Sequence, residues 1–479
     1  MGFMTPDFVP AVPEMFLLAM ACLILVVDVY VRERYRPFTY HLSQAALVGT
    51  AMLAVTLFPS LPTLTFDDTF ISDGMSVVLK VFILLVSYFA FFYMRAYLRD
   101  HNLFKGEYFI LGLFGILGMM VLVSAHSLLT VYLGLELLSL CLYSLVALNR
   151  DSIAASEAAM KYFVLGALAS GMLLYGMSLV YGVTGTLDLA GISRFIAQYH
   201  GESIILILGL VFVLVGIAFK LGAVPFHQWV PDVYEGAPTP VTLFIGSAPK
   251  IAAFGMLMRL LVDGLSGLQE DWTDMLIILA ILSMAIGNIV AIAQTNLKRM
   301  LAYSTIAHVG FLFLGIIAGT QSGYAASMFY IIAYAIMSMG GFAMIIWLGE
   351  SGSEADQLED FKGLNERNPW FALMMMILML SMAGVPPFVG FWAKWSVLRE
   401  VVSSGVTWLA VVAVAFAIIG LFYYLRIIRL MYFDRADNPA PVSSTPDMRV
   451  MISTNALAIL ALGIYPGGLL ALCAAALPG

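Results

Sequence analysis

Charged residues are scarce in this chain of 479 residues. Asp, Glu, Lys and Arg make up 11% of it, whereas soluble domains contain roughly 25%. Hydrophobic residues make up 62%, and the mean hydropathy is +0.96. This composition excludes a soluble globular protein and indicates a chain that spans a lipid bilayer many times.

Cysteines and nucleotide-binding motifs are also scarce or absent. Cys22, Cys141 and Cys473 lie far apart, without the spacing of a metal or iron–sulfur site. The chain contains neither G-x-G-x-x-G after a strand nor the phosphate loop G-x-x-x-x-G-K-[ST]. Neither nucleotide reduction nor ATP hydrolysis is supported, so we expect the driving energy to come from outside this chain.

Apolar stretches of about 20 residues, the length that crosses a bilayer, fill most of the sequence. We predict an all-α polytopic membrane protein with about fourteen transmembrane helices. The first stretch has no basic segment before it and no small-residue cleavage pattern after it, so we expect a retained helix. The predicted spans are 12–30, 41–58, 76–97, 107–124, 126–148, 154–183, 203–222, 240–262, 272–293, 297–319, 324–349, 370–397, 405–432 and 450–475.

The basic residues of the connections alternate along the chain. Since Lys and Arg accumulate on the cytoplasmic side, this pattern predicts both termini on the opposite side. The basic-poor connections carry only Arg194, Arg259 and Arg399. The basic-rich connections carry Arg32, Arg34, Arg36, Arg95, Arg99, Lys105, Arg150, Lys298, Arg299, Lys362, Arg367, Arg426, Arg429, Arg435 and Arg449.

Ionisable residues inside the predicted spans are the main functional signal. A charge at the bilayer centre costs on the order of 2.5–3.5 kcal/mol, so several along one chain suggest a pathway for ions or protons. The interior positions use Lys, whereas Arg, which does not release its proton in proteins, stays near loops and helix ends. The residues concerned are Glu136, Lys80, Lys161, Lys220, Lys250 and Lys394.

These charged residues differ in the roles that we predict. Glu136 lies well inside the fifth span and Lys161 about two turns into the sixth, so adjacent helices could form an ion pair between them. A purely structural ion pair is the alternative. Lys80 lies near the start of its span, and we expect its ammonium to reach the membrane interface.

Two spans are interrupted in a similar way. Gly222 and Pro225 follow Lys220 in the seventh span, and Pro386 and Pro387 precede Lys394 in the twelfth. Proline removes a helical hydrogen bond, and such breaks are tolerated in membranes where the backbone lines a wet cavity. Because the two spans run in opposite directions, we predict discontinuous helices 7 and 12 within two inverted five-helix repeats, helices 4–8 and 9–13. Ordinary proline kinks are the alternative.

Three histidines complete the candidates. His227 and His308 lie beside the lysine-bearing helices, where we consider proton relay and a purely structural role equally. We expect His126, at the edge of the fifth span, to be structural.

At this point the residues resemble a known family. The segment 225–241, PFHQWVPDVYEGAPTPV, and the segment 298–310, KRMLAYSTIAHVG, are similar to the signatures of the antiporter-like subunits of respiratory complex I and of multisubunit cation/proton antiporters. Within that superfamily, the stretch 384–391, GVPPFVGF, followed by Lys394, resembles the subunit N family of bacterial NADH-quinone oxidoreductases.

The resemblance implies roles for individual residues in proton half-channels. It implies that Glu136 tunes a lysine, that Lys161 is its partner and that Lys220 is the central proton carrier. It further implies that Lys250 connects the half-channels and that Lys394 is the exit-side carrier, while His227 and His308 bridge gaps through water. No cofactor is expected on this chain; NADH, FMN, iron–sulfur clusters and quinone would belong to partner subunits.

The resemblance also implies a setting. We expect a multi-pass protein of the bacterial cytoplasmic (inner) membrane with both termini periplasmic. Its partners would be a neighbouring antiporter-like subunit, small membrane subunits and the lipid bilayer, and we expect no nucleic acid partner. The expected divisions are 1–106 (helices 1–3), 107–262 and 263–432 (the repeats) and 433–479 (a loop and helix 14). A subunit of a cation/proton antiporter or membrane-bound hydrogenase remains the alternative, and a structural scaffold is disfavoured by the buried charges.

Overall fold

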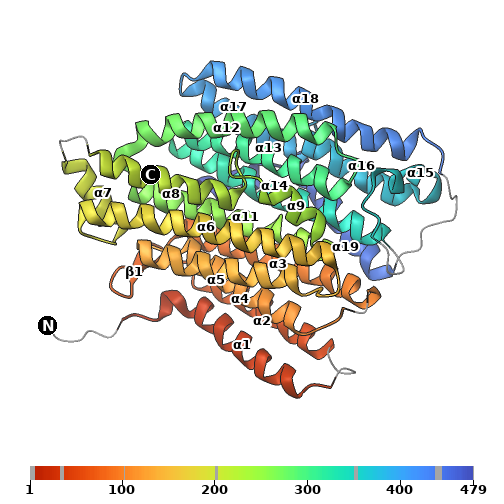
Figure 1. Ribbon diagram of the computed structural model, residues 1–479, viewed down its shortest axis with the longest axis horizontal. Coiled ribbons are helices and arrows are strands. Elements are labelled where there is room, and N and C mark those ends of the chain that lie inside the picture. Colours follow the sequence, from red (N-terminus) through yellow and green to blue (C-terminus); the bar gives the residue numbers. More distant parts are fainter. Residues whose placement is uncertain are drawn as a thin grey trace.

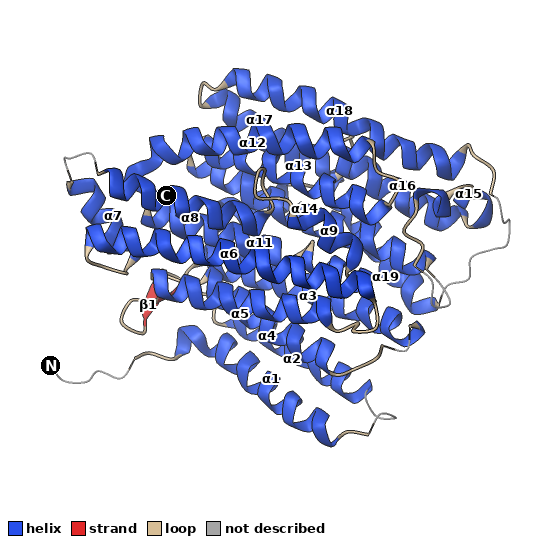
Figure 2. Cartoon of the chain, in the orientation of Figure 1, coloured by secondary structure: helices blue, strands red, loops and turns tan. Residues whose placement is uncertain are grey.

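The computed structural model describes residues 6–32, 37–101, 103–199, 203–349, 354–436 and 445–477. Almost all of this part of the chain is helical (Figure 2). The long helices lie alongside one another in a single bundle, with α1 at one edge and α18 at the opposite edge (Figure 1). Of the basic loop residues, Arg34 and Arg36 lie outside the described residues.

The N-terminal part combines three long helices with a small hairpin. The hairpin strands pair antiparallel, with Thr63 opposite Ser72. Asp73 then caps α3 by accepting a hydrogen bond from the Ser76 amide at 2.8 Å, which fixes where that helix begins. The elements are η1 (Val9–Ala11), α1 (Val12–Tyr30), α2 (Pro37–Thr56), β1 (Thr63–Thr65), β2 (Phe70–Ser72) and α3 (Gly74–Asp100).

The next part contains the first interrupted span. Its helices are α4 (Glu107–Val123), α5 (Leu128–Ala147), α6 (Ile153–Thr184), α7 (Leu189–Gln198), α8 (Ile204–Leu221), α9 (Trp229–Gly236), α10 (Thr239–Ile245), α11 (Ala248–Leu257), η3 (Met258–Gly264) and η4 (Ser266–Leu268).

The remaining part contains the second interrupted span. Its helices are α12 (Gln269–Ile292), α13 (Leu297–Ile317), α14 (Gln321–Leu348), η5 (Leu358–Phe361), α15 (Leu364–Arg367), α16 (Pro369–Ala383), α17 (Val389–Ser403), α18 (Thr407–Tyr432), α19 (Pro446–Ile464) and α20 (Gly467–Ala476).

Every predicted span coincides with helix. Within the described residues, eleven helical segments are long and apolar enough to cross a membrane, and α4, α16 and α20 are shorter apolar helices. Helix α2 fills the second predicted span but is not among the eleven. The prediction of a polytopic helical membrane protein is confirmed at this level, apart from the short hairpin of β1 and β2.

The breaks at Gly222 and Gly384 fall where the sequence predicts them, but two further breaks do not. The predicted span 240–262 is divided at Gly246 and Ser247, and the span 450–475 is divided at Tyr465 and Pro466. Pro249 follows the first break in the first turn of α11, where its missing N–H costs nothing, and Pro466 is the residue directly before α20. Apolarity alone therefore overestimates the continuity of these helices.

Burial separates inner from outer helices. The most apolar windows of α13 and α14 are 94% buried, whereas those of α6 and α18 are 33% buried. The segment from α10 to η3 is enclosed on all sides. Outer helices can expose apolar side chains because lipid replaces water there.

Glycines let several helix pairs approach closely. A Cβ on Gly118 of α4 would lie 2.6 Å from the Leu138 amide nitrogen of α5, and one on Gly287 of α12 would lie 2.5 Å from that of Ala307 in α13. Small residues at such contacts allow the backbone-to-backbone packing that holds membrane helices together. The inner helices are thereby fixed closely enough to position buried side chains.

Candidate functional site

The first interrupted span ends in a capped helix terminus. Gly222 adopts a left-handed conformation with φ of 84°, and the Val224–Pro225 peptide is cis. The amide of Gly222 donates to the carbonyls of Ala218 and Phe219. The last carbonyls of α8 therefore point beyond the helix, where they need other donors.

Lys250 from α11 supplies that donor. Its side chain is 1% exposed, and its Nζ donates to the carbonyls of Leu221 at 2.8 Å and Lys220 at 3.4 Å. A cation at a helix C-terminus is stabilised by the partial negative charge of these carbonyls. The ring of Trp229 lies 5.1 Å from the same ammonium and covers it.

Lys220 projects from the last turn of α8 toward α5. Its Nζ donates to the hydroxyl of Ser139 at 2.8 Å. Glu136 lies three residues before Ser139 on α5 and is close enough to act electrostatically on Lys220. The Glu136 carboxylate accepts a hydrogen bond from the Ser170 hydroxyl of α6. These contacts form a polar unit within otherwise apolar helices, in which Lys220 and Ser139 are buried and Glu136 is half-buried.

The second interrupted span repeats this arrangement. Gly384 has a φ of 88°, the Pro386–Pro387 peptide is cis, and the carbonyls of Met382 and Ala383 end α16. Lys394 from α17 donates to these carbonyls at 3.1 and 2.9 Å. The Phe311 ring lies 5.1 Å from its ammonium. Each break therefore has a left-handed glycine, two terminal carbonyls, a lysine and an aromatic ring.

His308 lies at the centre of a buried hydroxyl cluster. Its Nδ1 is 2.6 Å from the Tyr330 hydroxyl and its Nε2 is 3.2 Å from the Tyr424 hydroxyl. Tyr424 in turn hydrogen-bonds to Ser304, one turn before His308 on α13. Lys394 is near enough to influence His308 electrostatically. The hydroxyl cluster around His308 therefore lies close to Lys394 and to the carbonyls at the end of α16.

Comparison with known proteins decides the family. Residues 125–420 match the family model described as "NADH:quinone oxidoreductase/Mrp antiporter, TM". The chain is 58% identical over 478 residues to NADH-quinone oxidoreductase subunit N of Thioalkalivibrio sulfidiphilus, with both chains covered completely. The chain belongs to the NADH-quinone oxidoreductase subunit N family.

Further relatives agree with this assignment. Subunit N of Thiobacillus denitrificans is 58% identical over 471 residues, with 98% of each chain covered. A chain of respiratory complex I from Thermus thermophilus shares the fold with a TM-score of 0.82 and 30% identity, covering 96% of this chain and 99% of that one. The resemblance drawn from the sequence motifs is confirmed.

The predicted pairing of Lys161 with Glu136 is wrong in this subunit N family member. Lys161 Nζ instead lies 2.8 Å from Asp232 of α9 and 2.8 Å from Glu157 of its own helix, with 43% of its side chain exposed. Glu136 instead contacts Ser170 of α6. Ser170 lies nine residues after Lys161, which corresponds to about 13 Å along the helix. The two charges lie at different depths, so the side chains do not meet.

The prediction for Lys80 is also wrong. The lysine does not extend to the interface; it is 1% exposed and lies 2.6 Å from Glu14 of α1. The Phe70 ring lies 5.0 Å from its ammonium. Because α1 brings an acid to the same depth, the charge is compensated inside the protein.

The other two histidines occupy different surroundings. His227 is half-buried in the connection between α8 and α9, and its Nδ1 has no hydrogen-bond partner among the described residues. His126 is buried, with its Nε2 3.6 Å from Asp188.

Charged pairs also close the ends of the spans. Lys298 Nζ lies 2.6 Å from Glu354, in the connection after α14, and Arg259 lies 2.8 Å from Asp73. Burial alone would raise the pKa of Glu354, but the charge of Lys298 and hydrogen bonds hold this pKa below the ordinary carboxyl value. For Asp73, burial likewise opposes Arg259, which lowers the pKa.

Reasoning from charge alone missed several residues of the site. Trp229, Ser139 and Tyr424 contact the candidate lysines or His308, yet none carries a charge that a scan of the spans would detect. Of these three residues, Trp229 could have been found from the sequence, because it lies within the first signature segment, 225–241. No cluster of three or more His, Cys, Asp or Glu suited to a metal ion occurs in the described part of the chain.

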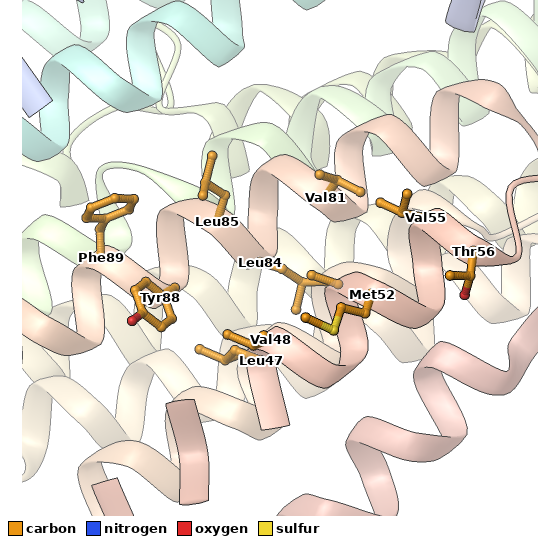
Figure 3. Close-up of a pocket in the computed structure, with 11 residues that line it drawn as sticks. Leu47, Val48, Met52, Val55, Thr56, Val81, Leu84, Leu85, Tyr88 and Phe89 are labelled. Atoms are coloured by element: carbon orange, nitrogen blue, oxygen red, sulfur yellow. The ribbon is translucent and has the colours of Figure 1, made fainter. Parts of the chain in front are cut away.

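An apolar groove lies apart from these residues. It has a volume of about 620 Å³ and is lined by α2 and α3 side chains, including Met52, Leu84 and Phe89 (Figure 3). Lys80 of α3 does not line it. The groove has almost no polar surface, so it offers no chemistry to the lysine sites.

Proposed function

We propose that this chain is a proton-translocating membrane subunit of an NADH:quinone oxidoreductase. The observation that carries the proposal is the pair of interrupted helices whose terminal carbonyls are held by Lys250 and Lys394. Lysine suits this position because a neutral amine keeps two N–H donors after it releases a proton. Intramembrane ionisable groups are functional by default, since their insertion is costly.

In this proposal each candidate residue has a role. Lys220 is the central carrier of the first half-channel, Lys250 connects the half-channels and Lys394 carries protons toward the exit. Glu136 biases Lys220 through the shared polar unit on α5. His227 and His308 relay protons through water and hydroxyl groups.

The proposed architecture consists of fourteen transmembrane helices with both termini periplasmic. Two inverted repeats occupy 107–262 and 263–432, flanked by helices 1–3 in 1–106 and by helix 14 in 433–479. The matched geometry at Gly222 and Gly384 supports the repeats, because the two breaks lie in the fourth helix of each repeat. The close pairs α4–α5 and α12–α13, the first two helices of each repeat, give the same support.

The proposal places redox chemistry in partner subunits. NADH, FMN, iron–sulfur clusters and quinone would be bound there, in a complex of the bacterial inner membrane. A neighbouring antiporter-like subunit and small membrane subunits would contact this chain. Copurification of flavin and iron–sulfur proteins tests this part of the proposal, whereas sodium-dependent transport without them would favour a cation/proton antiporter.

Lys220→Arg tests the carrier role directly. Arg preserves the positive charge but does not release a proton at accessible pH, so a carrier predicts loss of pumping and a fixed charge predicts its retention. Proton translocation and NADH-driven quinone reduction are measured in the assembled complex for wild type, Lys220→Arg and Lys220→Ala. Arg194→Gln, on an exposed side chain of α7, is the control. Wild-type pumping by the Arg variant would falsify the carrier role.

A further inference from the structure

The two signature segments of the sequence meet at one place. Asp232 and Glu235, from the first segment, both lie on α9, and Arg299, from the second, begins α13. The Nη1 of Arg299 donates to Asp232 at 2.9 Å and to Glu235 at 2.7 Å. The proton-carrier roles above do not use any of these three residues.

A second cation reaches the same acid from another helix. Lys161 of α6 donates to the other oxygen of Asp232 at 2.8 Å. We refer to Lys161, Asp232, Glu235 and Arg299 as the α9 clamp. It ties the eight-residue helix α9 to both α6 and α13. A helix this short does not hold its own position, so its packing and pairing partners decide where it lies.

The C-terminal end of α9 is held as well. Lys298, the residue before Arg299, donates to the carbonyl of Ala237 at 3.0 Å and pairs with Glu354. Glu354 accepts from the Thr239 hydroxyl at 2.9 Å and from the Tyr97 hydroxyl at 2.5 Å. Lys298, at the start of α13, and Glu354 therefore hold the connection between α9 and α10 in place.

Helix α9 carries a side chain of the lysine site. Trp229 lies in its first turn, three residues before Asp232, so both belong to neighbouring positions of one short helix. The Trp229 indole N–H donates to the Phe219 carbonyl at 2.9 Å and its ring covers Lys250. A shift of α9 would therefore displace the ring that covers Lys250. It would also displace the indole N–H that donates to the end of α8.

The clamp is poorly explained as a stabilising device. The side chains of Lys161, Asp232 and Arg299 are 43%, 31% and 30% exposed. Partly exposed ion pairs contribute little net stability, typically about 0–1 kcal/mol. The pairs instead determine position, because the Nη1 of Arg299 bridges two acids of α9 and Lys161 holds the second oxygen of Asp232.

We infer that Asp232, held by Lys161 and Arg299, is a positioning residue that sets α9, and with it Trp229, relative to Lys250. Lys161 thus acts from the surface on the first half-channel and not as the partner of Glu136. The inference rests on the proposed function, in which Lys250 transfers protons.

The main test compares Asp232→Asn, Asp232→Glu and Glu157→Gln in the complete complex reconstituted into vesicles. Glu157 is the matched control, since it also pairs with Lys161 at 2.8 Å but belongs to the same helix, α6. We expect Asp232→Asn to lower proton pumping per assembled complex by about tenfold, because small displacements far from the reacting atoms cost up to about a hundredfold. Its pH profile of pumping should also shift. Asp232→Glu should restore most of the activity, and Glu157→Gln should match wild type.

The pH profile separates positioning from simple support of the fold. A merely structural role would reduce the amount of assembled complex and leave the profile of the remainder unchanged, which overturns the inference. If Asp232→Asn does not assemble, Arg299→Lys replaces it, because it keeps the charge but loses the planar guanidinium, whose Nη1 donates to both carboxylates. A wild-type rate and profile for that variant would also overturn the inference.

Lys250→Ala distinguishes the two proposals. If Lys250→Ala stops pumping while Asp232→Asn pumps like wild type, the positioning role fails and the proposed function stands. If Lys250→Ala pumps normally, the carrier role of Lys250 fails, and with it the positioning inference. Loss of pumping in both variants, with the double variant no worse than Lys250→Ala, supports positioning through Lys250.

Discussion

At the scale of single residues, two lysines within the predicted spans act as backbone caps as well as charges. Lys250 and Lys394 each donate to two carbonyls that no helical amide reaches. A cation near a helix C-terminus contributes about 0.3–2 kcal/mol, depending on its burial. Because the amine still donates after losing a proton, the lysine can change charge without releasing the helix end.

Glu136 is the acid whose charge acts on Lys220, and its substitution is the first prediction. Glu136→Gln removes the charge that acts on Lys220 and should lower pumping by about tenfold, which corresponds to about 1.4 kcal/mol. Glu136→Asp should retain part of the activity, because the carboxylate survives on a shorter side chain. Pumping by reconstituted vesicles is measured after assembly is confirmed. Equal activity of the Gln variant and wild type would exclude the electrostatic role.

At the scale of elements, the left-handed glycines decide where the interrupted helices stop. Gly222 and Gly384 have positive φ, a conformation that costs other residues about 1–2 kcal/mol. Their positions place the terminal carbonyls within reach of a lysine. The left-handed glycines therefore make possible the hydrogen bonds from Lys250 and Lys394 to the helix ends.

Gly384→Ala should disturb pumping more than Gly405→Ala. Both glycines have nearly the same φ, 88° and 87°, so both substitutions carry the same backbone cost. A Cβ at Gly384 would lie 2.8 Å from the Cδ of Lys394, whereas one at Gly405 meets nothing within 4 Å. We expect Gly384→Ala to lower pumping several-fold and Gly405→Ala to leave it near wild type. Similar losses in both variants would mean that displacement of Lys394 is not the cause.

The connection after α14 predicts a pH-dependent stability. The pKa of Glu354 is lowered in the folded protein, so its contribution is present above the unfolded carboxyl pKa of about 4.3 and is lost as the pH falls through the folded value. Glu354→Gln should lower the melting temperature of the isolated complex at neutral pH by about 2–4 °C.

The difference between wild type and Glu354→Gln should disappear on acidification below the lowered pKa that Glu354 has in the folded protein. Melting curves of both proteins at a series of pH values measure it. Glu359→Gln, at an exposed acid of the same connection, is the control and should behave as wild type at every pH. A difference that persists at low pH would show that Glu354 acts through its shape and not its charge.

At the scale of the whole molecule, burial falls from the middle of the bundle toward two of its edges. Helix α14, whose most apolar window is 94% buried, lies in the middle, whereas α1 and α18, with windows 28% and 33% buried, lie at opposite edges (Figure 1). The basic connections and the hairpin at Thr63–Ser72 belong to opposite ends of the spans if the helices alternate in direction. The positive-inside rule then predicts that the hairpin lies on the periplasmic side.

Cysteine labelling tests this orientation. In a variant with the exposed Cys22 replaced by Ser, a cysteine at Asp67 should react with a membrane-impermeant reagent from the periplasmic side. A cysteine at Arg435 should react only after the membrane is opened. Cys141 and Cys473 are buried and serve as an internal background. The reverse pattern would place both termini in the cytoplasm.

The sequence by itself determined the class of protein, the course of most spans and two of the helix breaks. These features depend on local properties: apolar runs set helix length, and glycine and proline set where a helix stops. The candidate lysines were also identifiable, because an ionisable group inside an apolar run is conspicuous without any structure.

Only the tertiary structure decided which groups meet. Lys161 pairs with Asp232, 71 residues away, and Lys80 pairs with Glu14, because the rotation and depth of each helix are set by packing against its neighbours. The donation from Lys250 to the end of α8 likewise joins residues of separate helices. Apolar composition is similar on every face of these helices, so the sequence contains little information about which face turns toward which neighbour.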